Sequence, residues 1–479
     1  SNEMALAIKI KSLFSRVPKP VDDFKSFSSS VDSDSDIVKS VVEILIHQRS
    51  RTRWSSLRFL LSSTRVSPYQ VSQVALGIKS KPHLALRFFE FTLSHPNIFS
   101  HDLSSFSTLT HVLSRARLRH SAQDVMRLAL RSPDSFNHAK PVMRFFDLLA
   151  ESYHECDSAP FVFDLLLMTC LDLKKTDDAL DIARKLKSSG INPQTLSCNE
   201  LISSVTKLKG FNEGYALFKE LFGLKENEQT THLRPNTNTF NALMEGCLKS
   251  NEVEFMGEIW EEMGRAGCTP DNRTYSLYME GFIEAGKIDE VERLWEEMKR
   301  KMDPDVVCYN TVIGGLCKAG KVEKAEEIQR DMGEKRVEST CATYEHLVRG
   351  FCGAGDVGAA LLLYNEMRRR RFDAECGTVC MLIEALCEKR RVAEALLVKE
   401  GAMGMNLREK SYEMVIVGLC GDGRLKEALN IQAEMAGKGY KPSGNIYDAF
   451  VLGFQKAGDD HMVGILKREM HEFFRVPKD

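Results

Sequence analysis

The sequence predicts an all-α protein, a solenoid of helical hairpins that are each about 35 residues long. Two observations predict this fold class: four kinds of residue recur at about that interval, and the apolar residues between them follow the period of an α-helix. The composition agrees, because only 14 of the 479 residues are proline, which helix interiors do not tolerate.

The recurring residues share one register, clearest over the second half of the chain. Glycine stands at Gly286, Gly320, Gly355, Gly423 and Gly458, with gaps of 34, 35, 68 and 35 residues. The other markers are Pro193, Pro235, Pro270, Pro304, Pro442 and Pro477; Met263, Met298, Met332, Met367, Met403, Met435 and Met470; and Phe240, Tyr275, Tyr309, Tyr344, Tyr412 and Tyr447. Agreement between four independent markers indicates internal repeats.

The repeat over residues 306–340 illustrates the hairpin. Tyr309, Val312, Ile313 and Leu316 are spaced as one face of a helix, and Gly320 then supplies a turn. A second helix is predicted from residue 322 to residue 335. Neither helix can bury its apolar face alone, so neighbouring hairpins must stack. The tyrosine and methionine registers are therefore expected to be packing positions.

Residues 4–35 are predicted to be an organelle transit peptide. Between Met4 and Lys19 there are four basic residues and no acidic residue, and a serine-rich stretch follows. A mitochondrial destination is favoured, with the chloroplast as the alternative, and a merely disordered N-terminus is the simpler interpretation. Residues 36–159 are predicted to be a divergent helical region that contains degenerate repeats.

Charge and cysteine usage limit the function. The net charge of −2 predicts that any RNA-binding basic surface is confined to one face. Cys317, Cys352, Cys387 and Cys420 recur at 35, 35 and 33 residues, which indicates packing positions more than metal ligands.

No phosphate loop, nucleophile elbow or zinc motif is present, so no catalytic residue, metal or cofactor is predicted. No apolar run is long enough for membrane insertion.

The segment from Val306 to Gly320, VVCYNTVIGGLCKAG, closely resembles a pentatricopeptide repeat, and Thr269-Pro270-Asp271 resembles the end of one. The resemblance is to the P-type class of plant organelles and covers residues 160–478. It implies a right-handed superhelical solenoid of about nine repeats. Their predicted bounds are 160–194, 195–236, 237–271, 272–305, 306–340, 341–375, 376–408, 409–443 and 444–478.

In that family the fifth and last residues of a repeat read one RNA base. An amide or hydroxyl group then meets the Watson–Crick edge of an unstacked base. Carried over to this chain, Asn199 with Asn236 implies a pyrimidine, and Asn241 with Asp271 implies uracil. Ser276 with Asp305 implies guanine, and Asn310 with Thr340 implies a pyrimidine. The resemblance thus implies the order pyrimidine, uracil, guanine, pyrimidine.

Other pairs depart from the family's pattern, notably Asp164 with Gln194 and Glu345 with Glu375. The second residue of a repeat, which in the family wedges between bases, is apolar at Leu196 and Val307 only among the four reading repeats. Near the end of the first helices, the resemblance implies phosphate-binding lysines at Lys207, Lys249, Lys318 and Lys456. An ordinary solvated lysine at a helix C-terminus is an equal alternative.

The leading hypothesis is an organellar protein that binds single-stranded RNA selectively, without catalysis. Such binding would support transcript stabilisation, processing, splicing or translation, together with RNA-processing or ribosomal proteins as further partners. The alternative is a helical scaffold that contacts protein and ribosomal RNA by shape, such as an organellar ribosome component. The near-neutral charge favours the scaffold, and the intact Asn–Asp and Ser–Asp pairs favour sequence reading.

Overall fold

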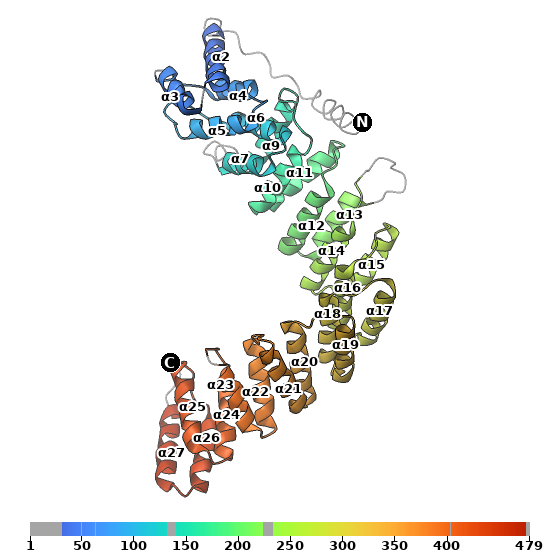
Figure 1. Ribbon diagram of the computed structural model, residues 1–479, viewed down its shortest axis with the longest axis vertical. Helices are drawn as coiled ribbons and strands as arrows, with labels where there is room; N and C mark the ends of the chain where they lie inside the picture. Colours follow the sequence, from blue (N-terminus) through green and yellow to red (C-terminus); the bar gives the residue numbers. More distant parts are fainter. Residues whose placement is uncertain are drawn as a thin grey trace. The chain divides into compact units, whose positions relative to one another are not determined.

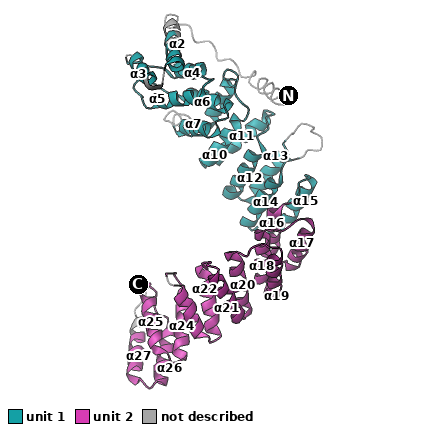
Figure 2. Cartoon of the chain, in the orientation of Figure 1, with its two compact units in different colours: residues 1–269 teal, residues 270–479 magenta. Residues whose placement is uncertain are grey.

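The computed structural model describes residues 31–48, 50–62, 64–131, 140–223, 233–402 and 404–475 (Figure 1). Residues 4–30 of the predicted transit peptide and Lys478 lie outside this described part. The regular elements of the described residues are all helices, joined by turns and loops, apart from an isolated bridge between Val66 and Phe99. The predicted all-α fold class is confirmed. The chain divides into two compact units, unit 1 with residues 1–269 and unit 2 with residues 270–479 (Figure 2).

Unit 1 begins with a region of irregular helices and continues into regular hairpins. Its elements are α2 (Val31–His47), α3 (Ser50–Leu60), α4 (Pro68–Gly77), α5 (Pro82–Leu93), α6 (Leu103–Arg115), α7 (Arg119–Arg131), α9 (Pro141–Ser152), α10 (Val162–Asp172), α11 (Thr176–Ser188), α12 (Thr195–Lys209), α13 (Phe211–Phe222), α14 (Thr237–Lys249), the 3₁₀ helix η1 (Val253–Phe255) and α15 (Met256–Arg265). Pro68, Pro82 and Pro141 each stand in a first helical turn, where the missing N–H costs nothing.

Unit 2 is a regular series of hairpins. They are α16 (Asn272–Glu284) with α17 (Ile288–Lys301), α18 (Val306–Lys318) with α19 (Val322–Glu334), α20 (Cys341–Ala354) with α21 (Val357–Arg369), α22 (Cys376–Glu388) with α23 (Val392–Gly401), α24 (Glu409–Gly421) with α25 (Leu425–Gly437), and α26 (Gly444–Lys456) with α27 (Asp460–Arg475). We call the two members of each hairpin its first helix and its second helix. In unit 1, α12 and α14 are likewise first helices.

The turn inside each hairpin explains the glycine register. Gly286, Gly320 and Gly355 adopt φ values of 70°, 74° and 79°, in the left-handed region that favours glycine. The 68-residue gap after Gly355 hides one more such turn. Arg390, 35 residues after Gly355, adopts φ 58° between α22 and α23. The repeat therefore persists where its glycine is absent.

The tyrosine register lies in the core. Tyr275, Tyr309 and Tyr412 are at most 1% exposed. Each hydroxyl donates to a carboxylate on the second helix of its own hairpin. The bonds are Tyr275 to Glu297 at 3.3 Å, Tyr309 to Asp331 at 2.9 Å and Tyr412 to Glu434 at 3.0 Å, always across 22 residues. These three tyrosines thus close their hairpins, and their buried rings are not available to stack on bases.

Small residues let successive first helices approach closely. A Cβ atom on Gly350 of α20 would lie 2.6 Å from the Sγ atom of Cys317 on α18, closer than real side chains come. The cysteine register is therefore a packing register here. Burial raises the pKa of the Cys317 thiol to about 12, which leaves it protonated and unreactive at neutral pH.

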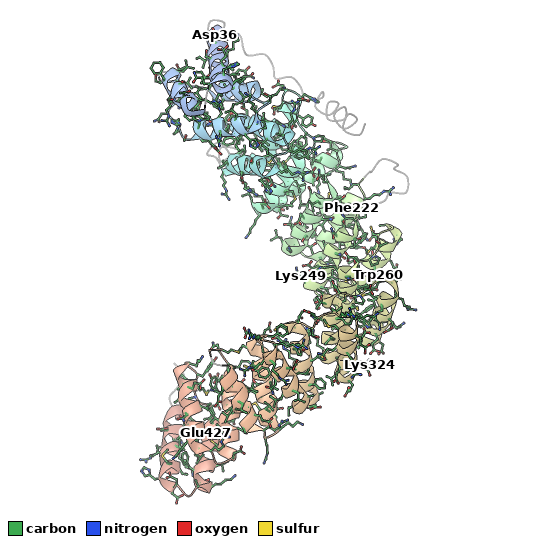
Figure 3. All side chains as sticks on the ribbon, in the orientation of Figure 1. Asp36, Phe222, Lys249, Trp260, Lys324 and Glu427 are labelled. Atoms are coloured by element: carbon green, nitrogen blue, oxygen red, sulfur yellow. The ribbon has the colours of Figure 1, made fainter. Side chains whose placement is uncertain are left out.

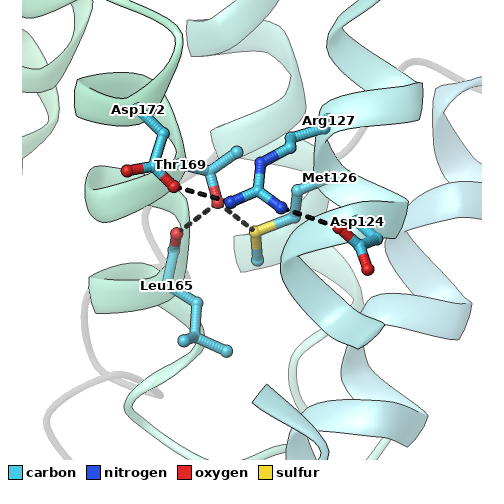
Figure 4. A network of polar contacts seen from close by, with 6 residues as sticks. All are labelled: Asp124, Met126, Arg127, Leu165, Thr169 and Asp172. Atoms are coloured by element: carbon cyan, nitrogen blue, oxygen red, sulfur yellow. Dashed lines mark hydrogen bonds and ion pairs between the residues drawn. The ribbon is translucent and has the colours of Figure 1, made fainter. Parts of the chain in front are cut away.

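Polar contacts add cross-links between hairpins in unit 1. Arg127 on α7 donates to Asp124 Oδ1 at 2.7 Å and to Asp172 Oδ2 on α10 at 2.6 Å (Figure 4). Beside it, the Thr169 hydroxyl donates to the carbonyl of Leu165 at 2.7 Å. Arg127 thus connects α7 with α10 through a contact between residues that are 45 positions apart in the sequence.

A buried histidine is expected to make unit 1 sensitive to acid. His111 on α6 is 0% exposed, with Nδ1 2.6 Å from Ser158 Oγ and Nε2 3.2 Å from Ser152 Oγ. Burial lowers its pKa to about 4, below the ordinary histidine value of about 6.5. The unfolded chain therefore takes up a proton first as the pH falls. The stability that His111 contributes is complete above about pH 6.5 and is lost as the pH falls from there towards 4.

Between pH 7 and pH 4.5 this group is expected to remove about 2 kcal/mol of unfolding free energy. Urea unfolding followed by circular dichroism measures the loss. H111Q removes the titrating group, and the exposed His120 supplies the matched control H120Q. The expected result is a smaller acid-induced loss in H111Q than in the wild type or H120Q. Equal losses in all three proteins would contradict the assignment.

Candidate nucleic-acid interface

In unit 1, hydrogen bonds join the predicted base-reading pair Asn199 and Asn236. Asn199 lies on α12 and is 8% exposed, and its Nδ2 donates to Asn236 Oδ1 at 3.2 Å. Asn236 is the N-cap of α14. Its Oδ1 accepts from Thr239 N at 3.0 Å, and its own N–H donates to Thr239 Oγ1 at 3.0 Å. Thr239 Oγ1 then donates to Asn199 Oδ1 at 2.7 Å. The side chains of Asn236 and Thr239 thus hold the amide group of Asn199.

Unit 2 repeats this arrangement at the pair Asn310 and Thr340. Asn310 on α18 donates from Nδ2 to Thr340 Oγ1 at 3.1 Å. Thr340 is the N-cap of α20, and its N–H donates to Thr343 Oγ1 at 2.9 Å. Thr343 Oγ1 donates to Asn310 Oδ1 at 2.6 Å. In both pairs the amide retains one N–H and one oxygen lone pair that could meet a base edge.

The pair Ser276 and Asp305 differs in its third member. Asp305 is the N-cap of α18 and accepts from Cys308 N at 2.9 Å. Cys308 occupies the place of the threonine, with its Sγ atom 3.1 Å from Ser276 Oγ. Ser276 is 5% exposed, whereas Asp305 is exposed. The structure therefore brings a hydroxyl and a carboxylate to this position, with a weakly polar thiol behind them.

The fourth predicted pair is divided between the units, since Asn241 belongs to unit 1 and Asp271 to unit 2. Asn241 is 8% exposed on α14. Asp271 is the N-cap of α16, and its Oδ1 accepts from Thr274 N and from Thr274 Oγ1, each at 2.8 Å. Asp271 N donates to Thr274 Oγ1 at 3.2 Å, as in the other threonine-containing caps. The pairing of Asn241 with Asp271 stays a prediction.

Two departing pairs use the fifth residue differently. Glu345 Oε1 accepts from the backbone N–H of Glu375 at 2.6 Å, and Asp164 Oδ1 accepts from that of Gln194 at 2.7 Å. These N–H groups hold the same place in the chain as the N–H groups of Asn236 and Thr340. The carboxylates are therefore occupied by the backbone and are poorly placed to read a base.

Arg349 offsets the charge of the double-glutamate pair. Its Nη2 atom lies 2.6 Å from Glu375 Oε2 and 3.9 Å from Glu345 Oε2, and its Nε donates to Thr378 Oγ1 at 2.8 Å. The carboxylates of Glu345 and Glu375 thus share one guanidinium group. This part of the surface is consequently less negative than the glutamate pair alone implies.

A cavity and two exposed apolar side chains accompany the predicted reading positions. Leu196 on α12 is 62% exposed and Val307 on α18 is 48% exposed. Val307 and Asn310 line a cavity of about 540 Å³ in unit 2, together with Lys318 and His346. Leu196 and Val307 belong to the two predicted reading repeats in which the resemblance implies an apolar wedge. A space of the size of this cavity can accept part of a nucleotide.

All four predicted phosphate-binding lysines are exposed near the ends of first helices. Figure 3 labels Lys249 among the side chains of the structure. Lys249 pairs with Glu245 at 2.5 Å, and Lys318 pairs with Glu284 at 2.8 Å. Lys207 and Lys456 form no ion pair with any described residue. Exposed ion pairs contribute little, so Lys249 and Lys318 can exchange their carboxylate for a phosphate.

Across the described ranges, no three histidine, cysteine or acidic side chains gather as metal ligands would. In the same part of the chain, no helix has the length and apolarity needed to cross a membrane.

Comparison with known proteins agrees with the repeat geometry. A model described as the PPR repeat family matches residues 235–283 and 304–353, and a PPR repeat model matches residues 273–302, 342–372 and 410–440. A pentatricopeptide repeat-containing protein of Arabidopsis thaliana is 48% identical over 482 residues, which cover 96% of this chain and 96% of the relative. The chain belongs to the pentatricopeptide repeat family.

Other members of the pentatricopeptide repeat family match over shorter stretches. An Arabidopsis thaliana relative named as mitochondrial is 35% identical over 152 residues, covering 32% of this chain and 28% of the relative. Among solved structures, the pentatricopeptide repeat protein PPR10 from maize is similar with 15% identity and a TM-score of 0.34, over 99% of this chain and 94% of that chain. A structure of PPR10 with an 18-nucleotide psaJ RNA element has 18% identity and a TM-score of 0.35, over 98% and 68%.

Thr239, Thr343 and Arg349 were not predicted from the sequence. A signal for the threonines was present, because a capping residue followed three positions later by threonine occurs at Asn236, Asp271 and Thr340. Arg349 gave no such signal. Its partner Glu345 lies four residues earlier on α20 itself. Its other partner, Glu375, is 26 residues away and reaches it only because α22 packs against α20.

Proposed function

We propose that this pentatricopeptide repeat protein binds single-stranded RNA selectively in an organelle and acts without catalysis. The observation that carries the proposal is the recurrence of one hydrogen-bonded amide, at Asn199 in unit 1 and at Asn310 in unit 2. An oriented amide offers a donor and an acceptor side by side, as pyrimidine recognition requires. Holding a strand in this way would protect it or expose it for processing, splicing or translation.

The charge distribution supports the proposal despite the net charge of −2. The second helices α17 and α19 carry ten acidic residues, whereas the first helices α16 and α18 carry two. Some of these carboxylates are neutralised by lysines, since Glu292 contacts Lys321 at 3.0 Å and Lys324 at 2.6 Å. The first helices, which bear the reading residues, are thus the less acidic side of these hairpins, where phosphates would meet less repulsion.

Selection of bound sequences from a random RNA pool by the purified full chain tests the proposal. The expected core is pyrimidine, uracil, guanine, pyrimidine. S276N is expected to change the guanine preference to uracil, because that repeat then carries the amide and carboxylate groups that Asn241 and Asp271 carry. A single hydrogen bond contributes about 1 kcal/mol, so the preference should change about fivefold.

S276A is the matched control, expected to weaken the guanine preference without creating a new one. A wild-type selection that shows no enriched core would reject sequence reading. In that case a scaffold for proteins or folded RNA becomes the better function, which the backbone-bound carboxylates of Asp164 and Glu345 favour for part of the surface.

The proposed compartment is the mitochondrion, with the chloroplast as the alternative. The basic segment from Met4 to Lys19 and the three Arabidopsis thaliana relatives named as mitochondrial support it. A fluorescent protein fused behind residues 4–40 should enter mitochondria. Accumulation in plastids or in the cytosol would overturn this part of the proposal.

A further inference from the structure

We propose that Thr239 and Thr343 are positioning residues that fix which way the reading amides of Asn199 and Asn310 face. The inference rests on the proposed function and adds a third residue to each reading pair. Each threonine stands at the third position of the first helix that follows the reading repeat. Both threonines are 0% exposed and so touch the base only through the asparagine.

The direction of this hydrogen-bond chain is set by the backbone. A peptide N–H can only donate, so Thr239 Oγ1 must accept from Asn236 N, at 3.0 Å. The only hydroxyl hydrogen is then free to donate to the nearest acceptor, Asn199 Oδ1 at 2.7 Å, with Asn236 Oδ1 farther away at 3.0 Å. The oxygen of the Asn199 amide is thereby fixed on the threonine side.

The nitrogen of the amide is fixed as a consequence. Asn199 Nδ2 faces Asn236 Oδ1 at 3.2 Å, which can only accept. A flipped amide would place its NH₂ group against the hydroxyl and its oxygen against another oxygen. Without the threonine hydroxyl, one of these two constraints disappears. The flipped form would exchange donor and acceptor towards the RNA and lose discrimination between bases.

The same chain in unit 2 runs from Thr340 N through Thr343 Oγ1, at 2.9 Å, to Asn310 Oδ1, at 2.6 Å. Asn310 Nδ2 then donates to Thr340 Oγ1 at 3.1 Å. The residue at the end of the repeat differs between the two sites, asparagine in one and threonine in the other. The positioning threonine is the member that both sites share.

Thr378 provides an internal contrast. It holds the equivalent third position of α22 and is also 0% exposed. Its hydroxyl accepts from Arg349 Nε at 2.8 Å, and the N–H of Glu375 goes directly to Glu345 at 2.6 Å. The repeat with Glu345 therefore has the buried threonine, but that threonine makes no hydrogen bond to an asparagine amide at the fifth position.

The test compares T239V and T343V, in the full chain, on RNAs that carry each of the four bases at the two addressed positions. T239V should lower the pyrimidine-over-purine ratio about fivefold at the position read by Asn199 and leave the other position unchanged. T343V should do the reverse. T239S restores the hydroxyl and should restore selectivity, and T378V should change neither position.

Equal loss of selectivity at both positions in T239V would indicate a general loss of structure and overturn the inference. Wild-type selectivity in T239V would overturn it as well.

A second measurement needs no RNA. The measurement is an NMR spectrum of protein whose asparagine residues carry ¹⁵N. T239V should shift the side-chain NH₂ signals of Asn199, and T343V should shift those of Asn310. T378V should shift neither set of signals. Unchanged NH₂ signals would overturn the positioning role. If the variants show these signal changes but the wild type has no base preference, the proposed function is rejected and the positioning role stands.

Discussion

Replacing Trp295 by alanine is expected to destabilise unit 2 by about 3 to 5 kcal/mol, the largest stability change predicted for this protein. Trp295 lies on α17 and is 2% exposed. Its ring and that of Tyr309 on α18 pack edge to face, with centroids 5.0 Å apart and an interplanar angle of 71°. The side chain therefore joins the second helix of one hairpin to the first helix of the next. Its loss would leave a cavity at that junction.

W295F is the matched control for this prediction. The Nε1 atom of Trp295 is buried and has no hydrogen-bond partner among the described residues. Phenylalanine keeps an aromatic ring and removes that unsatisfied N–H, so W295F should cost much less than W295A. Chemical unfolding followed by circular dichroism distinguishes them. Equal unfolding midpoints for W295A and the wild type would show that the junction does not depend on this ring.

Removing the four predicted phosphate-binding lysines is expected to have the largest effect on RNA binding. In K207Q/K249Q/K318Q/K456Q, the slope of log affinity against log salt should become shallower by about 1.4 to 2.8, since each single-strand phosphate contact contributes about 0.7. The lower value applies if Lys249 and Lys318 keep their ion pairs with Glu245 and Glu284 and therefore do not contact phosphate. At about 50 mM salt, the affinity should fall by about two orders of magnitude or more, because the difference between the slopes accumulates as the salt concentration decreases. Fluorescence anisotropy over a series of salt concentrations measures both quantities.

The control must change the total charge equally. K324Q/K335Q/K426Q/K467Q neutralises four exposed lysines on, or next to, second helices. It should leave the salt slope close to that of the wild type. An equal change of slope in both quadruple variants would mean that overall charge, and not the ends of the first helices, attracts the RNA.

The hairpins were predictable because their packing rules are local. A helix start, a positive-φ turn and a buried aromatic residue recur at fixed spacing, and the sequence records each of them. The turn at Arg390 shows the limit, since an arginine at φ 58° carries no composition signal. Only the turns on either side, 35 residues before and 33 after, indicate that a hairpin lies there.

The resemblance predicts base-reading residues, but not their surroundings. It names Asn199 and Asn310 as reading positions, which stays a prediction. It does not show that backbone N–H groups select the partners of these amides through Thr239 and Thr343. The fate of Glu345 was equally hidden, because its acceptor role depends on the N–H of a residue 30 positions away. Such contacts follow from how one hairpin stacks on the next.

The position of Thr343 matters for any exchange of repeats between proteins. The hairpin that carries Asn310 ends before Thr340, yet its hydrogen-bond chain is completed only in the first turn of α20. A graft cut at the helix boundary would carry the asparagine and leave its threonine behind. A repeat transferred between proteins should therefore be joined to its new neighbour after residue 343. The segment that must be transferred to keep the hydrogen-bond chain then ends a few residues beyond the segment that folds as a hairpin.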